Sequence, residues 1–129
     1  FKKNDIIEQK PVDRKYYYDN RYECTNTLKE FMHSYDTIYQ WRRVYPRANQ
    51  NNVCPTLTYN MGSGGHNVPL LKDKNGIRKL TPRECFNLQG FPSNYKLPEL
   101  CDSKLYQLAG NAVSVPVIEL IVNKLNEII

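Results

Sequence analysis

A short helix with both of its ends encoded in the sequence is the feature that most constrains the fold of this chain. Thr81 is a favoured residue at a helix N-cap, and Pro82 follows at the first helical position, where its missing N–H costs nothing. Glu84 stands three residues after Thr81, so the two residues can form a capping box. Gly90 supplies a left-handed end about two turns later, and Pro92 cannot continue the helix. The sequence therefore predicts a short, doubly capped helix between Thr81 and Gly90.

The composition is that of a folded protein with a basic central stretch. Of the 129 residues, 40% are hydrophobic, which is typical of a folded chain, and the formal net charge is +5. No acidic residue lies between Thr37 and Lys72, whereas this interval contains Arg42, Arg43 and Arg47. A stretch of one sign is expected where a protein contacts a polyanion.

The cysteines and the apolar runs argue against a metal site and a membrane span. The four cysteines include no Cys-x-x-Cys pair, so we expect no bound metal and reduced thiols of a cytoplasmic protein. No apolar run approaches the roughly 20 residues that a membrane-spanning helix needs. Phe1 rather than methionine stands first, which is expected of a piece or a processed form of a longer protein.

The region before the capped helix is predicted to be rich in β-structure. The aromatic and β-branched run Thr37–Tyr45 predicts one strand, which Pro46 ends, and Val53–Tyr59 predicts a second extended segment. A glycine-rich loop is expected at residues 61–66. Asn75-Gly76 then lies between two apolar runs, which predicts a β-hairpin.

Three further helices are predicted. Thr27 and Glu30 have the spacing of a capping box for a short helix, and another helix is expected from Ser103 to Gly110. From Val117 onward apolar residues recur at helical spacing. This last helix has an apolar stripe so wide that we expect it to pack against a partner surface.

Two segments resemble, in order and spacing, the ninth and tenth motifs of DNA (cytosine-5) methyltransferases. The ninth motif is matched by Arg78, Arg83 and Glu84, followed by Gln-Gly-Phe-Pro at residues 89–92. The resemblance implies that Arg78, Thr81, Arg83 and Glu84 have an architectural role, holding the recognition domain on the catalytic domain.

The tenth motif, Tyr-Lys-x-x-Gly-Asn-x-Val, is similar to the segment that begins at Tyr106. The departure is at the lysine, where this chain has Leu105 or Gln107, depending on the alignment. In the family this segment completes the S-adenosylmethionine pocket. The resemblance therefore implies cofactor-binding roles for Gly110, Asn111, Ala112 and Val113.

The resemblance also implies a target-recognition domain before the ninth motif. In the family a Thr-Leu or Thr-Val pair packs at the DNA beside the extruded cytosine, and Thr56-Leu57 stands in the corresponding place. Glycines let a backbone enter a groove, and arginines grip phosphates with two parallel hydrogen bonds. The residues expected to contact double-stranded DNA are Arg42, Arg43, Arg47, Thr56, Leu57, Ser63, Gly64, Gly65, His66 and Asn67.

The catalytic parts of the family are missing from the sequence. The family's nucleophile is the cysteine of a Pro-Cys-Gln motif, whereas Cys54-Pro55-Thr56 runs in the opposite order. The glycine-rich cofactor loop and the Glu-Asn-Val motif are absent as well. We therefore expect no catalytic residue in this chain and no activity from it alone. In the family's mechanism, which the resemblance implies, a thiolate on the missing part attacks C6 of a flipped cytosine.

Together these observations predict an α+β fold in two parts. Residues 1–77 are expected to form a β-rich target-recognition lobe, and residues 78–129 a helical tail whose C-terminal amphipathic helix packs on an absent α/β catalytic domain. That domain would be the N-terminal part of one enzyme or the other subunit of a split enzyme, in a bacterial cytoplasm. The isolated chain is expected to form a homodimer through the same helix. Two alternatives stay open: a stand-alone DNA-binding or regulatory module, and a relative of RNA cytosine-5 methyltransferases.

Overall fold

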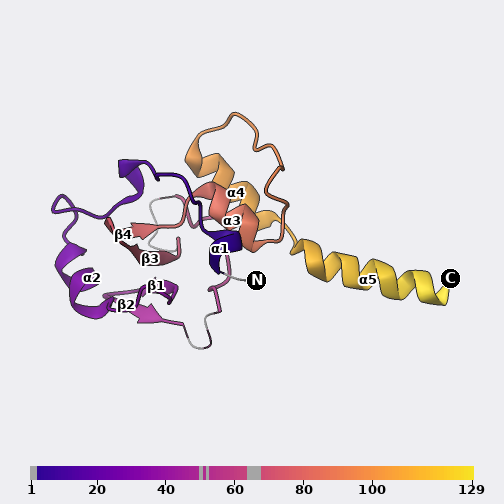
Figure 1. Ribbon diagram of the computed structural model, residues 1–129, viewed down its shortest axis with the longest axis horizontal. Helices are drawn as coiled ribbons and strands as arrows, with labels where there is room; N and C mark the ends of the chain where they lie inside the picture. Colours follow the sequence, from indigo (N-terminus) through magenta and orange to yellow (C-terminus); the bar gives the residue numbers. More distant parts are fainter. Residues whose placement is uncertain (1–2, 50, 52, 64–67) are drawn as a thin grey trace.

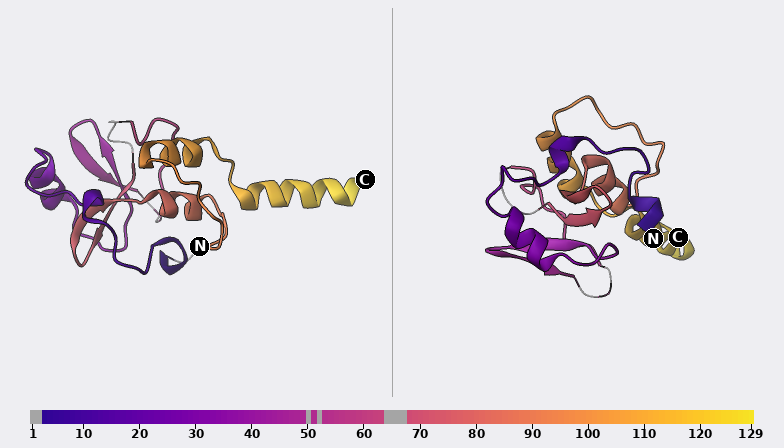
Figure 2. Two further views of the ribbon diagram at one scale, coloured as in Figure 1. Left: turned by 90° about the horizontal axis from the view of Figure 1, so that it is seen from above. Right: turned by 60° about the vertical axis from the view of Figure 1, so that its left-hand side comes forward.

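An antiparallel sheet lies beside a group of short helices, and the last helix extends away from both (Figures 1 and 2). The computed structural model describes residues 3–49, 51, 53–63 and 68–129. The sheet has the order β2-β1-β3-β4, and every pair of neighbouring strands is antiparallel. Its strands are β1 (Tyr39–Arg42), β2 (Tyr45–Ala48), β3 (Leu70–Asp73) and β4 (Gly76–Lys79). The predicted α+β fold class is confirmed.

The single strand predicted over Thr37–Tyr45 is wrong, because the chain reverses direction inside this run. Arg43 adopts a left-handed backbone conformation with a φ of 56°, and the indole Nε1 of Trp41 donates a hydrogen bond to its carbonyl oxygen at 3.1 Å. Pro46, which was expected to end the strand, instead lies buried within β2. Since β2 is an edge strand, a proline there removes no necessary ladder hydrogen bond.

The predicted hairpin is confirmed, and an aspartate organises its turn. Asp73 pairs with Gly76 across the strands, so Lys74 and Asn75 form the two-residue connection between β3 and β4. The Oδ1 atom of Asp73 accepts hydrogen bonds from the backbone amides of Asn75 and Gly76, at 2.8 and 3.1 Å. The segment predicted as extended at residues 53–59 joins no strand in the part that is described.

The helices are short except for the last. They are α1 (Lys3–Ile6), the 3₁₀ turn η1 (Arg14–Tyr16), α2 (Thr25–Phe31), α3 (Pro82–Leu88), α4 (Asp102–Asn111) and α5 (Val115–Ile128). The capping box predicted for Thr27 and Glu30 is wrong, because α2 begins at Thr25 after the N-cap Cys24, whose side chain makes no capping hydrogen bond.

Helix α3 has both predicted caps. The Thr81 hydroxyl accepts a hydrogen bond from the Glu84 amide, and the Glu84 carboxylate accepts one from the Thr81 amide. Gly90 has a φ of 85°, and its amide donates to the Asn87 carbonyl while the next amide, of Phe91, donates to Phe86. This pair of bonds is the Schellman arrangement, in which a left-handed glycine satisfies the last helical carbonyls.

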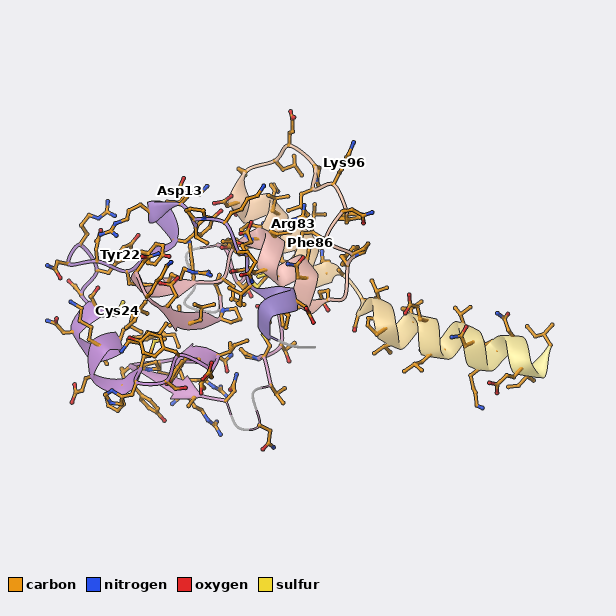
Figure 3. All side chains as sticks on the ribbon, in the orientation of Figure 1. Asp13, Tyr22, Cys24, Arg83, Phe86 and Lys96 are labelled. Atoms are coloured by element: carbon orange, nitrogen blue, oxygen red, sulfur yellow. The ribbon has the colours of Figure 1, made fainter. Side chains whose placement is uncertain are left out.

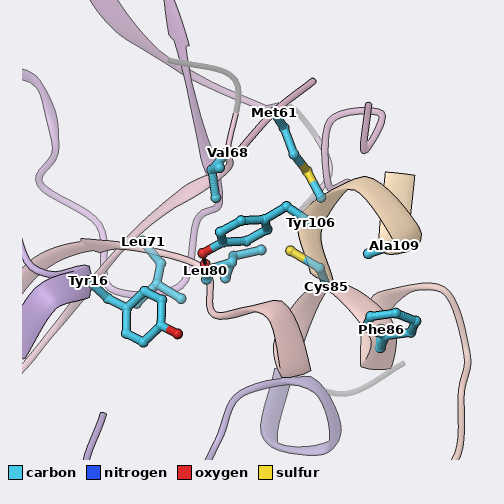
Figure 4. Packing of buried hydrophobic residues seen from close by; sticks show 9 residues of the cluster. All are labelled: Tyr16, Met61, Val68, Leu71, Leu80, Cys85, Phe86, Tyr106 and Ala109. Carbon is cyan, nitrogen blue, oxygen red and sulfur yellow. Dashed lines mark hydrogen bonds between the residues drawn. The ribbon is translucent and has the colours of Figure 1, made fainter. Parts of the chain in front are cut away.

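Two hydrophobic clusters cover opposite faces of the β3–β4 hairpin. On one face α2 packs over a cluster that includes Leu28, Leu70 and Ile77. On the other face the core joins β3, α3 and α4 (Figure 4). Its buried members are Tyr16, Met61, Val68, Leu71, Leu80, Cys85, Phe86, Tyr106 and Ala109. The boundary predicted after residue 77 falls within β4 and stays a prediction.

Candidate functional site

Arg78 and Glu84, from the first of the two matched segments, form a fully buried ion pair. The two Nη atoms of Arg78 each lie 2.7 Å from one carboxylate oxygen of Glu84, and the side chains are 1% and 0% exposed. The Nε atom of Arg78 lies 2.9 Å from Asp73 at the hairpin turn. Burial by itself would lower the pKa of Arg78, but the two carboxylates raise that pKa above its ordinary value. The guanidinium therefore stays charged and joins the hairpin to α3.

The same carboxylate ties the N-terminal segment to α3. The Glu8 amide donates to Glu84 at 3.0 Å, and the Thr81 hydroxyl donates to the Glu8 carboxylate at 2.6 Å. Asn87 adds a hydrogen bond from its side chain to the carbonyl oxygen of Ile6. Nothing in the local sequence around Glu8 indicated this role, because its partners lie more than seventy positions away.

Arg83 stands apart from this network. Its side chain is half-buried, and its Nη1 atom has no hydrogen-bond partner among the described residues. The structure therefore brings together Arg78, Thr81 and Glu84 of the predicted architectural residues but leaves Arg83 outside their cluster.

The segment that resembles the tenth motif forms the joint between α4 and α5. Helix α4 ends at Asn111, and Ala112 is extended, with a ψ of 146°. The side-chain amide of Gln89 donates to the carbonyl oxygens of Ala109 and Ala112, at 3.0 and 3.1 Å, and the backbone carbonyl of Gln89 accepts from the Val115 amide at 2.8 Å. Gln89 thus holds both sides of the joint. Sequence reasoning included it in the ninth motif but assigned it no role.

Gly110 brings this joint against the predicted DNA-binding segment. A Cβ atom placed on Gly110 would clash with the backbone carbonyl of Thr58 and the amide of Tyr59, so no other residue permits this approach. A Cβ atom on Gly62 would lie 2.6 Å from the ring of Tyr106, which belongs to α4 as Gly110 does. Helix α4 therefore packs directly on the backbone that follows Thr56-Leu57.

The other predicted DNA-binding residues lie at the surface. Thr56 is exposed, and Leu57 packs partly against the core. Arg42, Arg43 and Arg47 are all exposed on the β1–β2 hairpin. Ser63 is exposed as well, while the predictions for Gly64, Gly65, His66 and Asn67 lie outside the described residues.

The four cysteines carry free thiols, and the thiol of Cys54 is partly buried. All four are free, and burial raises the pKa of Cys54 to about 12, so its thiol is protonated at neutral pH. Within the described ranges, no three Cys, His, Asp or Glu side chains gather in a way that could hold a metal ion.

Helix α5 exposes apolar side chains to solvent along its length (Figure 3). Its exposed apolar residues are Val117, Ile118, Leu120, Ile121, Val122, Leu125 and Ile128. A groove of about 520 Å³ lies where the joint meets the helix. It is lined by Val113, Val115, Ile118, Glu119, Val122 and Asn123.

By length and composition alone, the stretch Asp102–Ile128 would suffice to cross a membrane. The joint at Ala112 interrupts this stretch, and α4 buries Leu105, Tyr106 and Ala109 in the core. Helix α5 has 14 residues and is therefore about 21 Å long, short of the ~30 Å hydrocarbon core.

Comparison with known proteins agrees with the two matched segments. The model of the C-5 cytosine-specific DNA methylase family matches residues 2–127. The chain belongs to this family. Type II methyltransferase M.Bsp6I of Bacillus sp. (strain RFL6) is 60% identical over 112 residues, which are 87% of this chain and 36% of that protein.

More distant relatives carry the same kind of name. Type II methyltransferase M.HgiCI of Herpetosiphon aurantiacus is 40% identical over 79 residues, 61% of this chain and 18% of that protein. Type II methyltransferase M.HpaII of Haemophilus parainfluenzae is 49% identical over 47 residues, 36% of this chain and 13% of that protein. This C-5 cytosine-specific DNA methylase chain thus spans about a third or less of the length of these relatives.

Proposed function

We propose that this chain is the C-terminal part of a DNA (cytosine-5) methyltransferase, either as a piece of one polypeptide or as one subunit of a split enzyme. In this proposal the lobe of residues 1–77 holds the target duplex, and the tail of residues 78–129 completes the cofactor pocket. The observation that carries it is the contact of Gly110 with the backbone of Thr58. At this contact, the segment that resembles the family's cofactor-binding motif packs against the segment that resembles its DNA-recognition motif.

Contact with DNA is supported by charge and by exposure. Arg42, Arg43 and Arg47 present guanidinium groups at the surface, where they would contact the DNA duplex. Thr56 is exposed directly before the residues that α4 holds in place, so it would meet the duplex at a fixed distance from the joint. We extend this role to Ser63 and to the four glycine-loop residues that follow it.

The residues of the joint fit one wall of a pocket for S-adenosylmethionine. The exposed side chain of Asn111 makes no hydrogen bond within the described part of the chain, so its amide is free to bind a ligand. Val113 is 60% exposed and offers apolar surface beside it, with Ala112 and Gly110 shaping the backbone between α4 and α5. When bound, S-adenosylmethionine supplies the methyl group; these residues would hold and orient it.

The apolar face of α5 is assigned to the catalytic part of the same enzyme. Its exposed valines, leucines and isoleucines would be covered by an α/β domain, since a wide apolar stripe is stable only when it is buried. The share of the relatives' length that this chain does not span is large enough to contain that domain. In its absence the same face would pair two copies of the chain.

The chain alone is proposed to be inactive. Cys54, which is followed by Pro55, is the cysteine that most resembles the one in the family's Pro-Cys-Gln motif. Its pKa of about 12 keeps it from acting as a thiolate at neutral pH. The nucleophile would come from the part of the enzyme that this chain does not include. We place the assembled enzyme in the bacterial cytoplasm, where free thiols such as these four stay reduced.

Two measurements test the proposal. Fluorescence anisotropy with a random-sequence 24-base-pair DNA and with an RNA hairpin of similar length should show tighter binding to the DNA, weakening as salt rises. Methyl transfer from radiolabelled S-adenosylmethionine to DNA should be absent with the chain alone and appear when the unmatched part of M.Bsp6I is added. Preference for the RNA hairpin, or methyl transfer by the chain alone, would overturn the proposal.

A further inference from the structure

The β1–β2 hairpin leaves the sheet as a two-stranded ribbon. β1 pairs with β2 along its whole length, from Tyr39 opposite Ala48 to Arg42 opposite Tyr45. Its pairing with β3 is confined to Tyr39 opposite Leu70. From Gln40 onward β1 therefore has β2 as its only strand neighbour in the described sheet, and the hairpin lies at the edge of the sheet (Figure 1).

One face of the ribbon is used for packing, and the other carries Gln40, Arg42 and Arg47 together with Tyr45. Trp41 and Pro46 oppose each other on the face that continues from the buried Tyr39, and Trp41 packs against the cluster beneath α2. Because side chains alternate along a strand, Gln40 and Arg47 form a cross-strand pair on the opposite face. Arg42 belongs to that face too.

Four polar side chains of this ribbon make no polar contact with the rest of the described chain. Gln40, Arg42, Arg43 and Arg47 have no side-chain hydrogen bond and no ion pair within the described ranges. The sequence from residue 37 to residue 72 contains no carboxylate. Three unpaired guanidinium groups on one narrow ribbon are complementary in charge to a nucleic-acid backbone.

The tip of the ribbon is held in a defined shape. Arg43 has a left-handed backbone, a conformation that residues other than glycine adopt rarely, and Trp41 bonds its carbonyl oxygen. Val44, the other residue of the turn, is 74% exposed. Below the tip, the ring of Tyr45, the cross-strand partner of Arg42, lies 6.1 Å from that of Phe31 in α2.

From this geometry we infer that the β1–β2 ribbon reads base sequence in the major groove of the target duplex, with Gln40 and Arg47 at the base edges and Arg42 and Arg43 at phosphates. The inference rests on the proposed function. The major groove admits a two-stranded β-ribbon. Glutamine can recognise adenine and arginine can recognise guanine, in each case through two hydrogen bonds. Since the two side chains are direct cross-strand neighbours, they would read the same or adjacent base pairs.

The test is a selection of preferred sequences by the full 129-residue chain from a duplex library with twelve random base pairs. The unaltered chain should enrich a sequence. Gln40→Ala and Arg47→Gln should each lose about 10- to 100-fold of the preference at one base pair, and the two affected base pairs should be identical or adjacent. The other positions of the enriched sequence should be unchanged.

The phosphate contacts need a different readout and a matched control. Arg42→Gln and Arg43→Gln should weaken binding to all duplexes alike and reduce the slope of log affinity against log salt by about one each. Arg21→Gln is the control, because it removes the same charge from an exposed arginine that is already paired with Asp19. It should change neither the preference nor the slope.

The outcomes separate this inference from the proposed function. If the unaltered chain enriches a sequence and Gln40→Ala and Arg47→Gln enrich the same one, the ribbon does not read bases and the inference is wrong, while the proposed function stands. If the unaltered chain binds no duplex DNA, both fail. Enrichment that is lost equally in Arg21→Gln would also overturn the inference, because it would be an effect of net charge.

Discussion

Removing the charge of Glu84 should destabilise the protein more than any surface substitution of the same kind. Glu84→Gln keeps the size of the side chain but leaves the Arg78 guanidinium buried, with an amide NH₂ group competing for the space between its donors. Breaking one side of a buried ion pair costs about 3–5 kcal/mol. Asp73 remains as a partner of Arg78 but is itself 25% exposed. We therefore expect the free energy of unfolding to fall by about 4 kcal/mol.

Thermal and urea unfolding followed by circular dichroism measure this loss. For a chain of this length, about 4 kcal/mol corresponds to a fall in Tm of about 15 °C. The matched control is Glu127→Gln, which removes the same charge from an exposed pair with Lys124 on α5 and should change little.

A double variant separates the buried charge from the lost hydrogen bonds. Arg78→Met combined with Glu84→Gln leaves no uncompensated charge in the core, and the glutamine can still accept from the Thr81 amide. It should therefore be more stable than Glu84→Gln alone. If Glu84→Gln is as mild as Glu127→Gln, the ion pair does not hold the hairpin on α3 in the way described here.

Two further substitutions or modifications probe the joint and the thiols. Gly110→Ala should lower the stability by about 1–3 kcal/mol, because the added methyl group forces α4 away from the Thr58 backbone. It should also weaken binding to the random 24-base-pair DNA, and an unchanged Tm with unchanged binding would contradict the packing described. Iodoacetamide at pH 8, followed by mass spectrometry, should modify the exposed Cys101 well before Cys54, whose thiol ionises only near pH 12. Equal rates at the two cysteines in the folded protein would show that Cys54 is not buried as described; in urea the rates should converge.

The family and the capped helix were predictable from the sequence because both are recognised from residues that are close together in the chain. Thr81, Pro82, Glu84 and Gly90 lie within ten positions of one another, and each acts on backbone groups of the same helix. The β3–β4 hairpin was predictable for the same reason, since its turn is organised by hydrogen bonds that span two or three residues. Such features require little from the rest of the molecule.

The reversal at Arg43 was not predictable from periodicity. The run Thr37–Tyr45 alternates like one strand, and Arg43 is not a residue that favours a left-handed turn. The turn is held by the Trp41 indole, whose ring is positioned by packing over the cluster beneath α2. The tertiary contact therefore overrode the local pattern.

The sequence by itself determined the capped helix, the hairpin, the amphipathic α5 and the membership of a DNA methylase family. Each of these features depends on residues that lie close together in the chain. Only the tertiary structure decided that Arg78 is neutralised by Glu84 and Asp73, that Glu8 closes the same network, and that Gly110 touches Thr58. These contacts join positions far apart in the chain. The ion pairs form because a buried charge without a partner is costly. The close contact at Gly110 forms because glycine has no side chain to keep the two backbones apart.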